Sequence, residues 1–439
     1  MLEMYNALIL FGLLLIAGVI IRELIPPLQK VLLPASLIGG FLGLILGQQV
    51  LGLIEIPTAF TQITSIGMRI IMACVPIGVT VTAKRIYEHL DFTFTNMTAF
   101  GFQMIFGLLL GSFFMKFWPG LPEGWGLMGV AAYHGSHGTV PVVSEAIDAT
   151  GALGAQSIGM VMATIGILIA MIVGMFIANY GARRGWTTFT RDIANQPKYF
   201  FSGTLPEEKR ESLGKTTVNP TNVTGIALQL GIIAVSIKFG EMLFRALAQV
   251  IPFLGNVGAM LWGLVGGLIL WPIMRKLKVD KYVDKNTINQ ISNFTLEMII
   301  LAACATIQLD VISKLFVPLF LHALISCSIT GVFIFVWMKK IGHAEWFEKS
   351  LMLFGMCTGS NPQGLSLVRA VDPENKSCIY EALGVYNAVF FWNFIIIPFA
   401  ASIVLHNRIP IYIIGAGLML TFVVGTVLFS REKKVGNKI

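Results

Sequence analysis

Two short polar stretches interrupt an otherwise strongly apolar sequence. The first reads Tyr133-His134-Gly135-Ser136-His137-Gly138-Thr139-Val140-Pro141, and the second reads Thr358-Gly359-Ser360-Asn361-Pro362-Gln363-Gly364. Glycine is a weak helix former, and serine and threonine hydroxyls compete for backbone hydrogen bonds, so each stretch is a poor helix centre. Two such breaks, one in each half of an apolar chain, are typical of a transport site.

The chemistry of such a break is ligand binding by backbone and small polar groups. Positive N-terminal ends of half-helices attract a carboxylate, whereas free carbonyls and hydroxyls bind Na⁺. The alternative is a structural kink packed against its neighbours. We predict that the substrate is bound by residues of both stretches, namely Gly135, Ser136, His137, Gly138, Thr139, Thr358, Gly359, Ser360, Asn361 and Gln363.

Sodium ions prefer about five or six hard oxygen ligands, as other hard cations do. Candidates within and after the breaks are Ser136, Thr164, Asn361 and Asn387, with Asn393 as a further amide. His134 and His137 are three residues apart, but a transition-metal site needs a third ligand, and a hydrogen-bonding role fits better. The five cysteines have no metal-like spacing and are predicted to be free thiols.

Charged residues inside apolar segments are costly and rarely without a role. Arg69 could bind a carboxylate through its guanidinium fork, or extend outward to the membrane surface. Glu297 lies deeper and could couple ions or form a buried pair. Lys238, Glu241 and Arg245 lie on one helix face and are predicted to form a structural ion pair or to extend to the membrane surface. Glu145 and Arg369, near the ends of the broken segments, either anchor at the interface or guide the ligand.

Composition places most of the chain in a membrane. Hydrophobic residues make up 55% and charged residues only 12%, whereas soluble domains hold about 25% charged residues. The two broken segments, 125–148 and 350–371, are predicted to be hairpins. Eleven spanning helices are predicted near 5–24, 33–53, 64–82, 95–117, 157–180, 223–249, 257–274, 287–309, 313–339, 378–404 and 410–429.

Basic residues predict the orientation. Of the 31 lysines and arginines, 24 fall in alternate loops, which are therefore predicted to be cytoplasmic. The N-terminus is then outside and the C-terminal tail inside, with hairpin 125–148 entering from outside and hairpin 350–371 from inside. The net charge of +8 reflects this bias rather than nucleic-acid binding. The first apolar run has acidic Glu3 before it and Arg22 after it, so a cleaved signal peptide is not expected.

The two halves of the chain resemble each other. Gly135-Ser136 aligns with Gly359-Ser360, and Ala73-Cys74 aligns with Ala303-Cys304 in the same order. The predicted fold is an all-α polytopic membrane protein with two inverted-topology repeats, each of five spanning helices plus one re-entrant hairpin. Its parts are the first repeat at 1–180, a cytoplasmic linker at 181–222, the second repeat at 223–404, and an extra helix with a basic tail at 405–439.

At these residues the chain resembles the bacterial sodium/glutamate symporter family. Gly135-Ser136-His137-Gly138-Thr139 is similar to the family's Gly-Gly-His-Gly-Thr, and Ala163-Thr164-Ile165-Gly166 to its Ala-Thr-Phe-Gly. Asn293 falls where the family has asparagine, which adds it to the Na⁺ candidates. The departures are Ser136 in place of a glycine, a different second hairpin, and an eleventh helix.

The resemblance implies Na⁺-driven uptake of an acidic amino acid by a homodimer in a bacterial inner membrane, with hairpin-bearing units moving against a dimeric scaffold. We predict a Na⁺-coupled symporter for a small organic anion, with no enzymatic activity and no cofactor beyond the coupling ion. No Walker-type ATP-binding sequence is present. The alternatives are a cation/proton antiporter that uses Glu297 and a passive channel.

Overall fold

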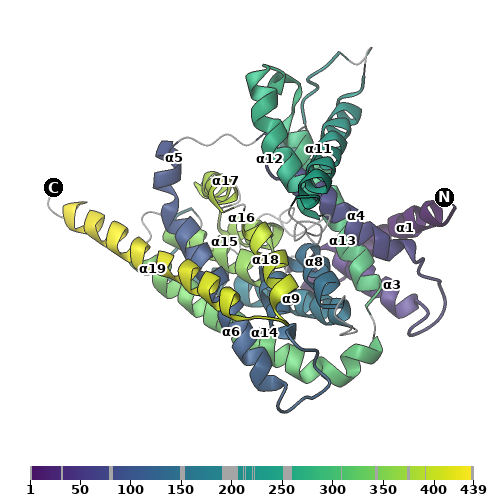
Figure 1. Cartoon of the computed structure of the whole chain (residues 1–439), viewed down its shortest axis with the longest axis horizontal. Helices are drawn as coiled ribbons and strands as arrows, with labels where there is room; N and C mark the ends of the chain where they lie inside the picture. Colours follow the sequence, from purple (N-terminus) through teal and green to yellow (C-terminus); the bar gives the residue numbers. More distant parts are fainter. Residues whose placement is uncertain are drawn as a thin grey trace. The chain divides into compact units, whose positions relative to one another are not determined.

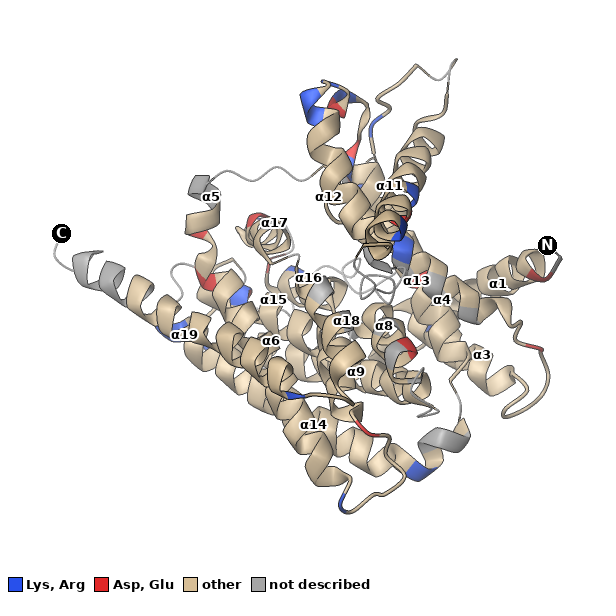
Figure 2. Cartoon of the chain, in the orientation of Figure 1, with Lys and Arg blue, Asp and Glu red and all other residues tan. Residues whose placement is uncertain are grey.

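The computed structural model is helical throughout the parts it describes, with no strand among them (Figure 1). Those parts are residues 2–30, 33–78, 83–148, 154–189, 206–210, 212, 214–219, 221, 223–250, 260–307, 309–341, 345–372, 376–390 and 392–436. Residues 190–205 of the predicted linker therefore lie outside the described residues. Charged residues lie mainly at helix ends and in connecting segments, which leaves most helix bodies apolar (Figure 2).

Two compact units divide the chain, and each draws on both halves of the sequence. The first unit comprises Met1–Ile25, Pro34–Thr80 and Ser202–Thr306. Its helices are α1 (Leu2–Leu24), α3 (Ala35–Leu46), α4 (Ala59–Cys74), α11 (Gly225–Ala248), α12 (Met260–Lys276) and α13 (Lys285–Ala305). Within this unit α13 packs on α3 and α4, and α11 lies along α12 (Figure 1).

The second unit comprises Pro26–Leu33, Val81–Phe201 and Ile307–Ile439, and it contains both polar stretches. In its first part are α2 (Pro26–Lys30), α5 (Ala83–Glu88), α6 (Leu90–Phe114), η1 (Trp125–Leu127), α7 (Met128–His134), α8 (Ser136–Asp148) and α9 (Ala155–Arg183). In its second part are α14 (Leu309–Ile341), α15 (Trp346–Thr358), α16 (Asn361–Val371), α17 (Ile379–Val389), α18 (Asn393–Ile403) and α19 (Ile409–Gly436).

Both predicted breaks occur where the sequence places them. The first helix pair, α7 and α8, breaks at Gly135, and the second pair, α15 and α16, breaks at Gly359 and Ser360. The members of each pair pack against each other. That the pairs re-enter a membrane, and from which side, stays a prediction.

The tenth predicted span, 378–404, is wrong as a single helix. It forms α17 and α18, which are separated at residues 390–392. The Trp392 indole N–H donates to the Val389 carbonyl at 2.9 Å, and the Asn393 amide donates to the Tyr386 hydroxyl at 2.9 Å. These side chains bond to groups beside the break and stabilise it, although the sequence there holds neither glycine nor proline.

Seven of the described helices are long and apolar enough to cross a membrane. They are α1, α6, α9, α11, α13, α14 and α19. The predicted span 33–53 is shorter than expected, because α3 ends at Leu46 and the Gln48 side-chain oxygen then accepts the Ile56 N–H at 2.9 Å in a turn. The chain is thus a multi-pass membrane protein, while the number of eleven spans stays a prediction.

The Lys285 ammonium group binds backbone carbonyls at the C-terminal end of α4. It donates to the carbonyls of Cys74 at 3.0 Å and Ile77 at 2.6 Å. Helix α4 ends at Cys74, and its last carbonyls have no partner within the helix. Lys285 therefore supplies the hydrogen bonds that would otherwise be missing inside the unit.

Replacing Lys285 with methionine is expected to destabilise the protein by about 2–3 kcal/mol, because buried carbonyls lose a charged donor. The matched control is Lys276→Met, since Lys276 is exposed at the end of α12. Surface changes of this kind stay within about 0.5 kcal/mol. Thermal unfolding in detergent, followed by tryptophan fluorescence, measures both. Equal melting temperatures for the two variants would contradict the assigned role.

Candidate functional site

At the first break, the Thr139 side chain contacts Gly135. The Thr139 hydroxyl donates to the Ala131 carbonyl at 2.6 Å, across the end of α7. A Cβ atom on Gly135 would lie 2.1 Å from Thr139 Oγ1, so no larger residue fits there without movement. Ser136 follows with φ of 54°, in the left-handed region that favours glycine. A glycine at Ser136 would adopt this conformation without steric cost.

His137 connects the first break to α9. Its Nε2 lies 3.0 Å from Thr164 Oγ1, and its Nδ1 lies 3.1 Å from Ser136 Oγ. Thr164 donates its own hydroxyl proton to the Met160 carbonyl at 3.0 Å. His137 is therefore the donor at Nε2 and the acceptor at Nδ1. The structure thus brings together three predicted residues, Ser136, His137 and Thr164, in one buried chain of hydrogen bonds.

The second break is built from extended backbone and a close helix crossing. Ser360 is extended, with φ of −165°, and its hydroxyl bonds to the Gln363 side-chain oxygen. The Thr358 hydroxyl turns back to the Phe354 carbonyl at 2.6 Å. A Cβ on Gly355 would lie 2.4 Å from the Gly364 Cα, so α15 and α16 meet backbone to backbone here. This crossing fixes the angle at which the two half-helices leave the break.

Both breaks lie against the same part of α9. Thr164 bonds to His137 of the first break, and Gly166 faces the second. A Cβ on Gly166 would lie 2.4 Å from the Thr358 carbonyl oxygen and 3.1 Å from the Tyr133 ring. One turn further on, Ala170 would lie 3.3 Å from a Cβ on Gly359. The middle of α9 is therefore where the two polar stretches meet.

Gln103 of α6 is a buried contact of both breaks that sequence reasoning missed. Its side-chain N–H groups donate to the Cys357 carbonyl at 2.8 Å and to Thr330 Oγ1 at 3.1 Å. Its oxygen lies 2.8 Å from His134 Nδ1. A glutamine inside an apolar segment was the available signal, since buried amides are costly unless fully paired.

The remaining candidates fall in different places. Gly138 is buried next to His137, whereas Asn361 and Asn387 are half-buried in the second unit. Asn293 is exposed on α13 of the first unit, and Glu297 is half-buried on the same helix. Asn293 therefore belongs to the first unit, whereas the other Na⁺ candidates belong to the second.

Arg69 has partners of its own in the first unit. Its guanidinium lies over the Trp262 ring, 5.6 Å from the centroid. The predicted ion pairs of α11 are present nearby, because Glu241 bonds to Lys238 at 3.1 Å and to Arg245 at 2.6 Å. Arg69 as a substrate ligand stays a prediction.

The two glycines at the breaks are expected to differ in their tolerance of a side chain. Gly135→Ala should lower transport by about tenfold, because overpacking costs about 1–3 kcal/mol. Gly359→Ala should keep the transport rate within about threefold of the wild-type rate, since the nearest atom to the added Cβ would be 3.2 Å away. Initial rates of substrate uptake into proteoliposomes measure both variants. Equal losses would show that the clash with Thr139 is unimportant.

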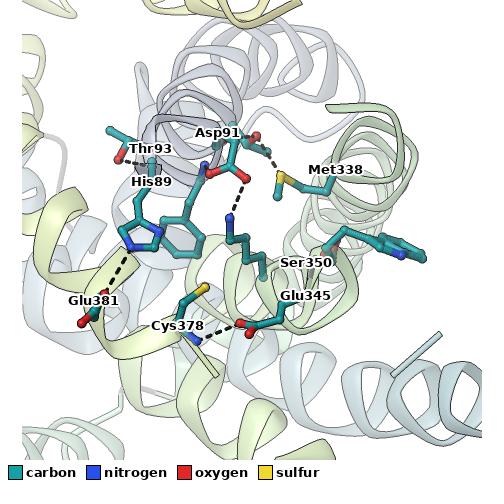
Figure 3. Close-up of polar contacts among 12 residues, drawn as sticks. His89, Asp91, Thr93, Met338, Glu345, Ser350, Cys378 and Glu381 are labelled. Atoms are coloured by element: carbon teal, nitrogen blue, oxygen red, sulfur yellow. Dashed lines mark hydrogen bonds and ion pairs between the residues drawn. The ribbon is translucent and has the colours of Figure 1, made fainter. Parts of the chain in front are cut away.

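A second polar cluster surrounds the start of α15 (Figure 3). The Lys349 ammonium lies 2.7 Å from Asp91 Oδ2, and both side chains are almost fully buried, at 4% and 1% exposure. The other Asp91 oxygen accepts the Phe92 backbone N–H at 2.7 Å. This ion pair joins the first turn of α6 to the first turn of α15, so it fixes the base of the second helix pair.

Neighbouring groups complete the cluster. The Cys378 backbone N–H donates to the Glu345 carboxylate at 2.8 Å, and His89 lies 3.7 Å from Glu381 (Figure 3). Burial, reinforced by the Lys349 charge, lowers the pKa of His89 below its usual value despite the nearby carboxylates. His89 is therefore neutral at pH 7.

The described residues contain no group of three or more histidine, cysteine, aspartate or glutamate side chains that could hold a metal ion. Apart from the His134 and His137 rings, the polar groups at the breaks are hydroxyls, side-chain amides and backbone carbonyls. Such hard oxygen donors suit an alkali cation better than a transition metal.

The chain matches the model of a known protein family. The model of the sodium/glutamate symporter family matches residues 1–359, which reach from α1 to the break of the second helix pair. The matched part includes the first unit, both sides of the first break and the contact stretch of α9. No curated protein sequence matches the chain.

Proposed function

The chain belongs to the sodium/glutamate symporter family, and on that premise we propose that it couples Na⁺ entry to the uptake of glutamate or a close analogue. The observation that carries the proposal is the convergence of both breaks on Thr164 and Gly166 of α9. Small polar groups from two broken helix pairs then surround one place, as in transporters that bind substrate between discontinuous helices.

The inverted repeat is part of this proposal. An offset of 224 residues relates the last residue of α7, His134, to the last residue of α15, Thr358. The same offset relates Gly135 to Gly359. The first unit takes α1, α3 and α4 from one half and α11, α12 and α13 from the other, which supports two copies of one plan.

We further propose that substrate binds at the start of the second half-helix of each pair. Helices α8 and α16 begin at Ser136 and Asn361, directly after the breaks. Unpaired N–H groups at such ends attract carboxylates. Glutamate carries two carboxylates, one for each end, and the neighbouring hydroxyls and carbonyls are left to bind Na⁺.

Alternating access would follow from movement of the second unit relative to the first. The division into two compact units supports this mechanism, because both breaks belong to one unit. We propose that the first unit forms the scaffold of a homodimer in a bacterial inner membrane. One charge moving through 100 mV supplies roughly 2.3 kcal/mol. With more than one Na⁺ per glutamate, net positive charge would enter, so the membrane potential would increase the accumulation of glutamate.

The deciding experiment is uptake of labelled L-glutamate into proteoliposomes under an imposed Na⁺ gradient. Accumulation above the external concentration is expected with Na⁺ and not with K⁺. Proton flux without glutamate uptake, abolished by Glu297→Gln, would favour the antiporter instead. Equilibration without accumulation would favour a passive channel. Either result would refute the proposed function.

A further inference from the structure

One buried nitrogen of the first break has no hydrogen-bond partner among the described residues. It is Nε2 of His134, the last residue of α7. His134 is not needed for the His137–Thr164 connection, and its ring lies edge-on to Phe100 at 5.0 Å. A buried polar atom left unpaired costs about 1–3 kcal/mol. A ligand that forms a hydrogen bond with this nitrogen would remove that cost.

The chemical character of this nitrogen follows from Gln103. A carbonyl can only accept, so the Gln103 nitrogen must face Cys357 and its oxygen must face His134. His134 Nδ1 is therefore the donor of that hydrogen bond at 2.8 Å. In the neutral ring the proton is then on Nδ1, and Nε2 presents a lone pair. The unpaired atom is an acceptor.

His134 Nε2 lies beside the first break and is connected to the second through Gln103. His134 directly precedes Gly135, and through Gln103 it is linked to Cys357, next to Thr358 at the end of α15. An acceptor at this point cannot pair with a carboxylate, which is itself acceptor-only when ionised. Na⁺ prefers the oxygen donors available nearby. An ammonium group, with three N–H donors and a positive charge, fits the lone pair.

We propose that His134 Nε2 accepts a hydrogen bond from the α-ammonium group of the substrate, and that Gln103 positions the ring for this contact. The inference rests on the proposed function, because it assumes an acidic substrate at the two breaks. It goes further by making His134 the residue that distinguishes an amino acid from a dicarboxylate of the same length.

The test compares L-glutamate with glutarate, which has the same carbon chain and both carboxylates but no ammonium group. Binding of each is measured by isothermal titration calorimetry on the detergent-purified protein in saturating NaCl. The wild type is expected to prefer glutamate. His134→Ala should weaken glutamate binding roughly ten- to hundredfold, the range for a hydrogen bond to a charged group, and should leave glutarate within about twofold.

Three further variants make the result specific. His134→Asn keeps an acceptor and should retain part of the preference, which covers the case in which the alanine variant folds poorly. Gln103→Leu should lower the preference because the ring loses its fixed orientation. Ser326→Ala is the matched control, since the Ser326 hydroxyl is also buried and unpaired in the second unit. It should leave the ratio of the two affinities unchanged.

The outcomes separate the two levels of the argument. If the wild type binds glutamate with Na⁺ but His134→Ala weakens both ligands equally, His134 is structural and the inference is wrong while the proposed function stands. The same holds if His134→Ala leaves glutamate binding unchanged. If the wild type shows no Na⁺-dependent binding of glutamate, the proposed function fails and this inference fails with it.

Discussion

Replacing Asp91 with asparagine is expected to lower the free energy of unfolding by about 3–5 kcal/mol, because it leaves the buried ammonium of Lys349 without a counter-charge. The two groups lie 2.7 Å apart and are almost inaccessible to solvent. Lys349→Met should cost a similar amount, since it strands the Asp91 carboxylate instead. Both variants should show a lower apparent melting temperature in detergent, followed by tryptophan fluorescence.

The double variant Asp91→Leu with Lys349→Met separates charge burial from packing. Replacing a buried ion pair by apolar residues of similar volume is often neutral or stabilising. The double variant should therefore melt above either single variant. Arg245→Met is the control. The Arg245 side chain, which pairs with Glu241, is 72% exposed, and exposed ion pairs contribute only about 0–1 kcal/mol. Losses that simply add in the double variant would contradict the pairing of Asp91 with Lys349.

Gly166→Ala is expected to reduce Na⁺-dependent uptake roughly ten- to hundredfold, because overpacking at this crossing costs about 1–3 kcal/mol. The added Cβ would lie 2.4 Å from the Thr358 carbonyl oxygen, which belongs to the backbone and cannot turn away. The second break would then be displaced from α9. Initial uptake rates at equal amounts of reconstituted protein give the measurement.

The matched control for Gly166→Ala is Gly384→Ala on α17. A Cβ there meets nothing within 4 Å, so only the gain in helix propensity remains. Alanine in a helix is favoured over glycine by about 0.5–1 kcal/mol, and this effect acts in the direction of higher stability at both sites. Uptake should survive in Gly384→Ala. If Gly166→Ala also transports at the wild-type rate, the backbone crossing is not required.

The sequence predicts the two main breaks well because their cause is local. Glycine with serine or threonine weakens a helix wherever it stands, so Gly135 and Gly359 mark the breaks without knowledge of the fold. The break between α17 and α18 has a different origin. It depends on Phe390 packing against Phe100 of α6 and on the bonds made by Trp392 and Asn393, which are tertiary contacts.

The site shows the same limit. His137 and Thr164 are recognisable as polar residues in apolar surroundings, but their bond joins positions 27 residues apart and comes from the packing of α8 on α9. Gln103 and the Asp91–Lys349 pair lie outside the polar stretches, and their partners are 254 and 258 residues away in the chain. Pattern along one helix does not reveal partners on another.

Helix α19 lies beyond the part of the chain that matches the family, yet it packs closely along α6 (Figure 1). The Thr98 and Thr421 hydroxyls are 3.0 Å apart, and a Cβ on Gly101 would lie 2.5 Å from the Gly415 carbonyl oxygen. The C-terminal helix therefore belongs to the second unit, whereas α1 belongs to the first. A donor and an acceptor dye placed at the two ends of the chain would thus sit on different units. Energy transfer between them in single molecules would test the relative movement of the units that the proposed alternating access requires.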